Sequence, residues 1–296
     1  MDSRLNDFLD RVDQVLARLD PLLPAQPPVI DWTQCLAARW HREGRSGYLQ
    51  PLQVSLDLDL TDLIGIDTQR EHLARNTRQF VAGLPANHAL LWGARGTGKS
   101  SLVRALLGEH AAAGLRLIEI ERDHLADLPR LVECLAGLPQ RFVLFCDDLS
   151  FDAGEGDFRV LKSVLDGSLE RAPDNVLLYA TSNRRHLVPE HESDNENWKR
   201  VDGELHPNEA VEDKIALSDR FGLWLSFYPF TQDHYLAVVR HWIEVLAASA
   251  QLDWQWDDEL GKLAIRWALG RGNRNGRCAY QFARQWVGTA LLESSP

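Results

Sequence analysis

The sequence has few cysteines, no long apolar run and no excess of positive charge. Its 296 residues include four cysteines, which are scattered without a Cys-x-x-Cys pair or histidines at zinc-binding spacing. We therefore expect no disulfide framework. No run approaches the roughly 20 apolar residues that cross a bilayer, and the first 20 residues lack the features of a secretion signal. We expect a reduced, cytoplasmic protein without a membrane segment.

The charge balance is acidic, with 43 Asp and Glu residues against 32 Lys and Arg residues and a net charge of −11. This balance argues against broad binding to nucleic acid or anionic membranes, because such surfaces carry a positive excess. A local basic groove is still compatible with the total charge. The composition is 45% hydrophobic and 25% charged, as in a globular chain that buries a substantial core in one large or two smaller domains.

The N-terminal segment differs from the rest of the chain. Residues 1–20 place apolar side chains at helical spacing, which predicts an amphipathic helix that ends at Pro21. Such a helix either packs on its own domain or docks a partner. We assign residues 1–51 to an N-terminal helical arm and linker.

Between residues 52 and 230, short apolar runs alternate with helical segments. The runs read HALLWG, LRLIEIE, RFVLFCDD, NVLLYATSN and LWLSFYPF. This alternation predicts a three-layer α/β core whose parallel sheet is covered on both faces. The acid-rich stretch 189–213 is expected to be a solvated loop inserted in this core. Residues 231–296 contain helical patterns only and predict a small helical domain.

The strongest motif follows the first of these runs. It reads GARGTGKS and fits the GxxxxGK[ST] phosphate loop, with a strand before it and a helix after it. Its glycines let backbone N–H groups point at phosphate oxygens, and the helix presents its positive end to the same anion. Lys99 is expected to neutralise the outer phosphates and Ser100 to hold Mg²⁺. The predicted nucleotide-binding residues are Gly93, Ala94, Arg95, Gly96, Thr97, Gly98, Lys99, Ser100 and Ser101.

Polar side chains end two of the later apolar runs. Asp147 and Asp148 end RFVLFCDD, and Asn183 ends NVLLYATSN. Strand ends of a parallel sheet are where ligands bind in open α/β folds. We expect Asp147 to hold Mg²⁺, Asp148 to orient or deprotonate the attacking water, and Asn183 to contact a water or the terminal phosphate. Outside this context, an Asp pair or an Asn at such a place would be read as a turn residue.

The order of these motifs resembles that of the AAA+ ATPases. A phosphate loop, an apolar strand ending in Asp-Asp, a strand ending in Asn and a final helical domain cover about residues 60–290. Within that superfamily, the segments LIGID, LLWGARGTGKSS, CDDLSF and SDRFG look like an uncharacterised bacterial family known only as a domain of unknown function. The resemblance implies an AAA+ core with a C-terminal helical lid, an ATP and Mg²⁺ requirement, and a homo-oligomer that forms with ATP.

The resemblance also implies roles for single residues. Gly65 falls at the adenine-side box before the core, and Asn183 matches the sensor 1 position. Arg220, in ALSDRFG, matches the arginine finger that reaches the ATP of a neighbouring subunit; otherwise it is a surface Arg near a helix end. Arg277 is the first choice for the sensor 2 arginine and Arg274 the second, and either residue can instead be a loop cation or a cap.

One position departs from the family pattern. Most AAA+ proteins end the second motif in Asp-Glu, whereas here Asp148 replaces the Glu. The aspartate is shorter by about one bond length of 1.5 Å, and catalysis is sensitive to errors of that size. Some replication-initiator relatives also carry Asp-Asp, so the pair is compatible with hydrolysis. A slow rate would suit a switch better than a motor.

Three functions fit the sequence. The leading hypothesis is a Mg²⁺-dependent AAA+ ATPase that remodels or assembles an unidentified protein partner. The second is a nucleic-acid-linked ATPase of the helicase-loader or initiator kind, suggested by the Asp-Asp pair and by 27 arginines against 5 lysines. The third is a nucleotide sensor that does not hydrolyse ATP.

Overall fold

The computed structural model describes most of the chain between residues 29 and 294. The described residues are 29–44, 46–150, 160–162, 165, 173–183, 199–201, 204–206 and 219–294. The helix expected over residues 1–20 lies outside them, and so does most of the stretch 189–213. Within these ranges, no helix combines the length and apolar character needed to cross a membrane.

In the described part of the chain, seven strands form one sheet in the order β2-β1-β4-β5-β6-β3-β9. In this order, every neighbouring pair between β1 and the edge strand β9 is parallel. At the other edge, β2 pairs antiparallel with β1. All five runs predicted as strands are strands of this sheet. The bounds are β1 (Ala37–Glu43), β2 (Ser46–Leu52), β3 (Ala89–Gly93), β4 (Leu115–Glu119), β5 (Arg141–Cys146), β6 (Val176–Ser182) and β9 (Leu223–Phe227).

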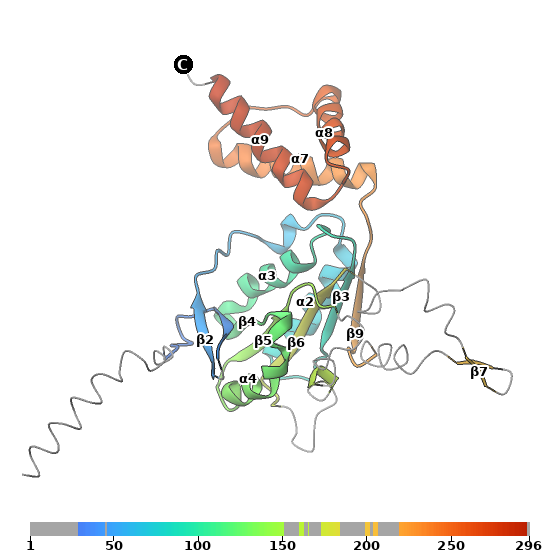
Figure 1. The fold of residues 1–296 in the computed structure, drawn as a ribbon. Coiled ribbons are helices and arrows are strands. Elements are labelled where there is room, and N and C mark those ends of the chain that lie inside the picture. Colours follow the sequence, from blue (N-terminus) through green and yellow to red (C-terminus); the bar gives the residue numbers. More distant parts are fainter. Residues whose placement is uncertain are drawn as a thin grey trace, which may run out of the picture.

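Helices cover both faces of the sheet, as predicted, and α2 and α3 lie between it and the C-terminal helices (Figure 1). The crossover from β3 to β4 runs through α3, which starts at the phosphate loop, and α4 follows β4. The elements of this part are η2 (Leu60–Asp62), α2 (Asp67–Val81), α3 (Lys99–His110), η3 (Ala111–Ala113), η4 (Arg122–Asp127) and α4 (Leu128–Leu135).

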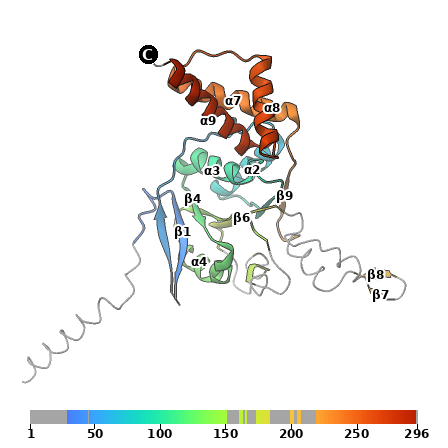
Figure 2. The ribbon, with the colours of Figure 1, turned by 45° about the horizontal axis from the view of Figure 1, so that its top comes forward.

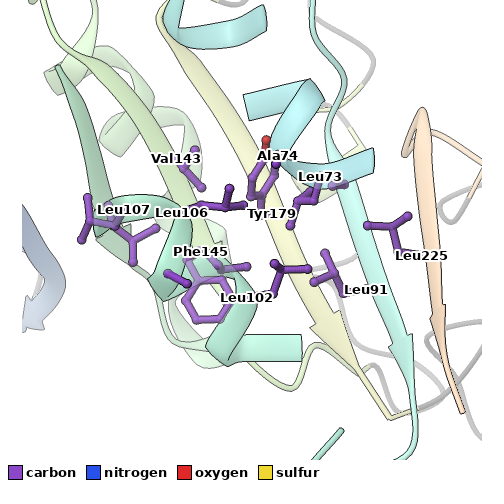
Figure 3. Packing of buried hydrophobic residues seen from close by; sticks show 14 of the residues in the cluster. Leu73, Ala74, Leu91, Leu102, Leu106, Leu107, Val143, Phe145, Tyr179 and Leu225 are labelled. Atoms are coloured by element: carbon purple, nitrogen blue, oxygen red, sulfur yellow. The ribbon is translucent and has the colours of Figure 1, made fainter. Parts of the chain in front are cut away.

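Successive strand residues face opposite sides of the sheet and so belong to different apolar clusters. In β3, Ala89 and Leu91 pack with α2 and α3, whereas Leu90 packs on the face that α4 covers. Figure 3 shows the first of these faces, where Leu102 and Leu106 of α3 lie over strand residues such as Phe145. This two-sided burial explains why these strands are almost continuously apolar in sequence.

The C-terminal domain, called the lid from here on, is a separate helical layer above the core (Figure 2). It consists of α7 (Gln232–Ala250), α8 (Asp258–Gly270) and α9 (Gly276–Ser294). Thr231 caps α7 by accepting a hydrogen bond from His234 N–H, and Asp257 caps α8 through Leu260 N–H. The lid packs around an apolar cluster that includes the fully buried Tyr235.

The start of the core is where the structure differs from our expectation. The boundary expected between residues 51 and 52 falls inside β2, and the hairpin of β1 and β2 joins the sheet through β4. Trp40 of β1 is 1% exposed and packs with the core on the face that α4 covers. The hairpin was missed because Arg, His and Glu side chains interrupt its apolar pattern. The expected linker therefore contributes two strands to the core.

Within the acid-rich stretch, the structure describes a short antiparallel pair, β7 (Lys199–Val201) and β8 (Glu204–His206). This pair forms a sheet of its own, apart from the core sheet. The segment inserted between β6 and β9 thus contains strand structure where we expected a loop.

Candidate functional site

The phosphate loop joins β3 to α3 and is packed against the end of β9. Ala94 N–H donates to the carbonyl oxygen of Phe227 at 3.0 Å. Gly93 has φ 130°, and a Cβ there would lie 2.0 Å from the same oxygen, so only glycine fits. Thr97 Oγ1 donates to Ala94 O at 2.8 Å across the loop. These contacts fix the loop at the carboxyl edge of the sheet.

Lys99 folds back over this loop at the start of α3. Its ammonium donates to the carbonyl oxygens of Gly93 at 2.8 Å and Ala94 at 2.7 Å, and to Asn183 Oδ1 at 3.3 Å. Burial lowers the pKa of Lys99, and the charges of Asp147 and Asp148 oppose that effect. The ammonium therefore lies among the loop carbonyls and the polar ends of two strands.

Asp147 accepts two hydroxyl hydrogen bonds on a single oxygen. Ser100 Oγ donates to Asp147 Oδ1 at 2.6 Å, and Thr181 Oγ1 donates to the same atom at 2.5 Å. A hydroxyl and a carboxylate side by side are the oxygen ligands that Mg²⁺ takes when it bridges phosphates. These residues thus fit a Mg²⁺ ion. Cys146, just before them, is buried, and burial raises the pKa of its thiol to about 12.

Asp148 has an unusual backbone. Its φ is 56°, in the left-handed region, and its N–H donates to Thr181 Oγ1 at 2.9 Å. Asn183 Nδ2 donates to Asp148 Oδ1. Arg95 Nη2 of the phosphate loop lies 3.8 Å from Asp148 Oδ2. Each carboxylate oxygen of Asp148 therefore faces a different donor.

A cavity of about 890 Å³ lies between the core and the lid and includes these residues. Its polar lining includes most of the phosphate loop, the acid pair, Thr181 and Asn183. Apolar and aromatic residues from the segment before α2 and from the lid also line it. Its apolar lining includes Leu63, Ile64, Ile66, Phe230, Val238, Trp242 and Tyr280. A cavity lined by both a phosphate loop and apolar side chains suits a nucleotide.

The arginines suggested by the resemblance are not equally placed. Arg277, near the start of α9, lines the cavity, whereas Arg274 is exposed and lies outside the lining. Arg220 lies in the turn before β9 and is half-buried, also outside the cavity lining. Arg277 is thus the better candidate within one chain, and a role for Arg220 on a second chain stays a prediction. Ser101 also lines the cavity.

Gly65 lies beside the cavity, and its role at the adenine side stays a prediction. It is not among the residues that line the cavity, although Ile64 and Ile66 on either side are. Its φ is 76°, and a Cβ there would lie 2.2 Å from His234 Nε2 of the lid. His234 in turn donates from Nε2 to Ile64 O at 2.8 Å. Gly65 thus makes room for a lid contact beside the cavity.

The sequence did not predict several other contacts between the lid and the core. His241 Nε2 of α7 lies 2.9 Å from Asp62 Oδ1. At the start of α9, Gly276 N–H donates to Gly96 O at 2.8 Å and Asn275 Nδ2 donates to Arg95 O at 3.3 Å. The Asn-Gly pair in the glycine-rich segment before α9 was the available signal. Thr181, which bonds both acids, was also missed, because a Thr inside a strand carries no motif.

The fold is that of the AAA+ proteins, and solved structures share it. A single-residue variant of the RuvB protein of Thermotoga maritima aligns with a TM-score of 0.50 at 15% identity, over 77% of this chain and 63% of that one. The ORC1 protein of Aeropyrum pernix, in complex with DNA, aligns with a TM-score of 0.53 at 16% identity, over 80% and 65%. This chain thus spans less than two thirds of the length of either. RuvB and ORC1 are AAA+ P-loop ATPases.

The chain belongs to the family described as "Protein of unknown function (DUF815)", whose model matches residues 33–290. The match begins before β1, so it includes the hairpin that our sequence boundary left outside the core. No curated protein matches the chain.

Proposed function

We propose that this protein is an ATPase that binds ATP with Mg²⁺ in the cavity between core and lid and hydrolyses it. The observation that carries the proposal is the meeting of Lys99, Ser100, Asp147, Asp148 and Asn183 in the lining of that cavity. These residue types are the ones that phosphoryl transfer to water requires. They come from three separate elements, so a chance cluster within one loop does not explain them.

Each residue has a defined task in this proposal. Lys99 neutralises the outer phosphates, and Ser100 and Asp147 hold Mg²⁺, which supplies charge neutralisation on the phosphate oxygens when bound. Asp148 orients a water and takes its proton. Asn183, which already donates to Asp148, fixes the direction of that carboxylate.

The direct test is Mg²⁺-dependent release of phosphate from ATP by the purified chain. We expect release above that of an Asp148→Asn variant, which keeps the shape of the side chain but not its basicity. Nucleotide binding without release above this control would support the sensor hypothesis instead. The short side chain of Asp148 supports the sensor hypothesis, because catalysis is sensitive to the position of the group that activates water.

Arginines complete the proposed site. Arg277 lines the cavity from the lid and is suited to contact the phosphates as a sensor 2 residue. Arg220 is proposed to act on the ATP of a neighbouring copy, where a guanidinium stabilises the charge of the transferred phosphoryl group. A homo-oligomer that forms with ATP follows from this role. Comparing particle mass with and without ATP for wild type and Arg220→Ala tests it, and a fully active monomer at any dilution would remove Arg220 from the site.

The work that hydrolysis drives is proposed to be the remodelling or assembly of a protein partner. Residues 1–28 and the stretch 189–213 are the candidate partner-binding segments, because the sequence places an amphipathic pattern in the first and many acidic residues in the second. Because β1 belongs to the sheet, a deletion should stop at residue 28 rather than reach the hairpin. We expect this deletion to keep ATP binding and to lose partner recovery in a pull-down. Equal recovery by both proteins would remove that role from the N-terminus.

The alternative is an ATPase linked to nucleic acid. It is supported by 27 arginines in an acidic chain, several of them on the exposed surface of the lid. ATP hydrolysis measured with and without DNA or RNA, at low and high salt, separates the two functions. Strong stimulation that weakens with salt favours the alternative, because phosphate contacts are salt-dependent.

A further inference from the structure

Arg95 occupies a place in the phosphate loop where the motif requires no particular side chain, and its side chain faces the acid pair. Its Nη2 lies 3.8 Å from Asp148 Oδ2, while Asn183 Nδ2 donates to Asp148 Oδ1. The carboxylate is thus flanked by an amide from the residue after β6 and a guanidinium from the phosphate loop. At 3.8 Å the charges attract without a hydrogen bond, so the lone pairs of Oδ2 stay available to a water proton.

The main chain of Asp148 is fixed, but its side chain depends on these neighbours. Asp148 N–H donates to Thr181 Oγ1 at 2.9 Å and Leu149 N–H donates to Thr181 O at 2.7 Å. Thr181 is 2% exposed, so this anchor is rigid. The Asp148 side chain is 58% exposed. Asn183 and Arg95 face its two carboxylate oxygens.

The backbone of Arg95 is itself held by the lid. Asn275 Nδ2 donates to Arg95 O at 3.3 Å, and Gly276 N–H donates to Gly96 O at 2.8 Å. The loop from which the Arg95 side chain projects is therefore fixed on both sides, by β9 and by the start of α9. A fixed origin is what a side chain needs in order to orient another one.

We propose that Arg95 is a positioning residue for Asp148, an inference that rests on the proposed ATPase function. In the step that Asp148 serves, the water oxygen bonds to the terminal phosphorus, the bond from that phosphorus to the bridging oxygen breaks with its electron pair going to ADP, and the water proton passes to the carboxylate. Aspartate reaches this water less far than glutamate by about 1.5 Å. Arg95 keeps the short carboxylate turned toward the phosphate loop, so that its limited reach is used in that direction.

The experiment compares full-length variants in kcat and in equilibrium ATP affinity. We expect Arg95→Ala to lower kcat by about 5-fold, the most that an exposed ion pair can favour one side-chain direction. The ATP Kd should change less than about 3-fold, because the loss lies in the chemical step. Arg95→Lys should recover part of kcat. The matched control is Arg266→Ala, an exposed arginine of α8 outside the cavity lining.

Repeating the Arg95→Ala substitution in an Asp148→Glu protein tests whether the effect depends on the length of the residue 148 side chain. In an Asp148→Glu protein the longer side chain reaches unaided, so Arg95→Ala should then lower kcat less than about 3-fold. The Arg95 side chain is 81% exposed, and an exposed pair adds little stability, so these variants should fold. A thermal melt of each variant checks this.

Several results would overturn the role of Arg95. One is a raised ATP Kd with unchanged kcat, which would make Arg95 a direct phosphate ligand. Another is an equal loss of kcat in the Asp148 and Asp148→Glu backgrounds, and a third is an Asp148→Glu protein without activity. If wild type is active and Arg95→Ala has the same kcat, only this inference is contradicted. A wild type that releases no phosphate overturns the proposed ATPase function and this inference together.

Discussion

The core and the lid are each held together by apolar burial, but they meet largely through polar contacts. The core packs α2, α3 and α4 on the two faces of the sheet, and the lid packs its helices around Tyr235 and Ile243. Between them lie the His241–Asp62 contact, the bond from His234 to Ile64 O and the bonds of the α9 start to the phosphate loop. A hydrogen bond contributes about 1 kcal/mol, whereas a buried large side chain contributes several times more. The cavity therefore lies where two separately packed parts meet, with Ile64 of the core packed against the apolar cluster of the lid.

The two parts also contribute different chemistry to this cavity. Lys99, Ser100 and the acid pair come from the core, together with Thr181. The lid supplies Arg277 and an aromatic wall. On this division, changes in the core should abolish the reaction, and changes at the contacts between core and lid should weaken nucleotide binding without removing it.

The largest effect is expected from Lys99→Ala in the core. The variant removes the cation that neutralises the outer phosphates, so phosphate release should fall by about 10²–10³-fold, as when a preorganised donor is lost. The measurement is phosphate release from saturating ATP with Mg²⁺. Lys262→Ala, at an exposed lysine paired with Glu259 in the lid, is the control that should leave the rate unchanged. A Lys99→Ala protein with the wild-type rate would place the chemistry elsewhere.

The next effect concerns the pH dependence of core stability. His88 Nδ1 accepts a hydrogen bond from Leu178 N–H at 2.9 Å, and burial lowers the pKa of His88 to about 4. The unfolded chain binds a proton near the ordinary pKa of 6.5 and the folded chain does not until about 4. The associated stability is therefore present above pH 6.5 and lost as the pH falls to 4. It amounts to about 3 kcal/mol.

Denaturant unfolding between pH 7 and pH 4 measures this loss, with core fluorescence as the probe. In His88→Asn, the amide oxygen can accept the same hydrogen bond without titrating in this range. The variant should be less stable than wild type at pH 7, but its free energy of unfolding should change less between pH 7 and pH 4. An equally steep pH dependence in both proteins would mean that other groups cause it.

The smallest effect is expected at the polar contacts between the core and the lid. His241→Ala breaks the contact with Asp62, worth about 1 kcal/mol, so the ATP Kd should rise by about 5-fold. The lid should stay folded, because its apolar cluster is untouched. Titration calorimetry with ATP checks the prediction, with Glu244→Ala at an exposed site of α7 as the control. A loss of lid helicity in His241→Ala would mean that this contact also holds the lid together.

Much of the core and the site was predictable from sequence because both depend on local patterns. The phosphate loop is a contiguous motif, and the acid pair and Asn183 each end an apolar strand, so the parallel sheet brings them to one edge. The lid helices follow from helical periodicity alone.

What the sequence did not predict depends on contacts between distant segments. The β1–β2 hairpin is a polar edge whose pairing with β4 no local pattern encodes. The fit of Gly65 to His234 joins positions far apart in the chain, and so does the bond of Asn275 to Arg95. Thr181 serves both acids through a hydroxyl that looks like any other strand residue. Such contacts become visible only once the fold brings the segments together.

The central claim is that core and lid together bind ATP in the cavity between them. Photolabelling of the full chain with 8-azido-ATP and Mg²⁺, followed by peptide mapping, tests it most directly. The aromatic lining that should receive the base includes Trp242 and Tyr280 of the lid. We predict labelled peptides that contain these residues, competed by excess ATP and lost in Lys99→Ala. Label confined to other peptides, or label that ATP does not compete, would contradict the account.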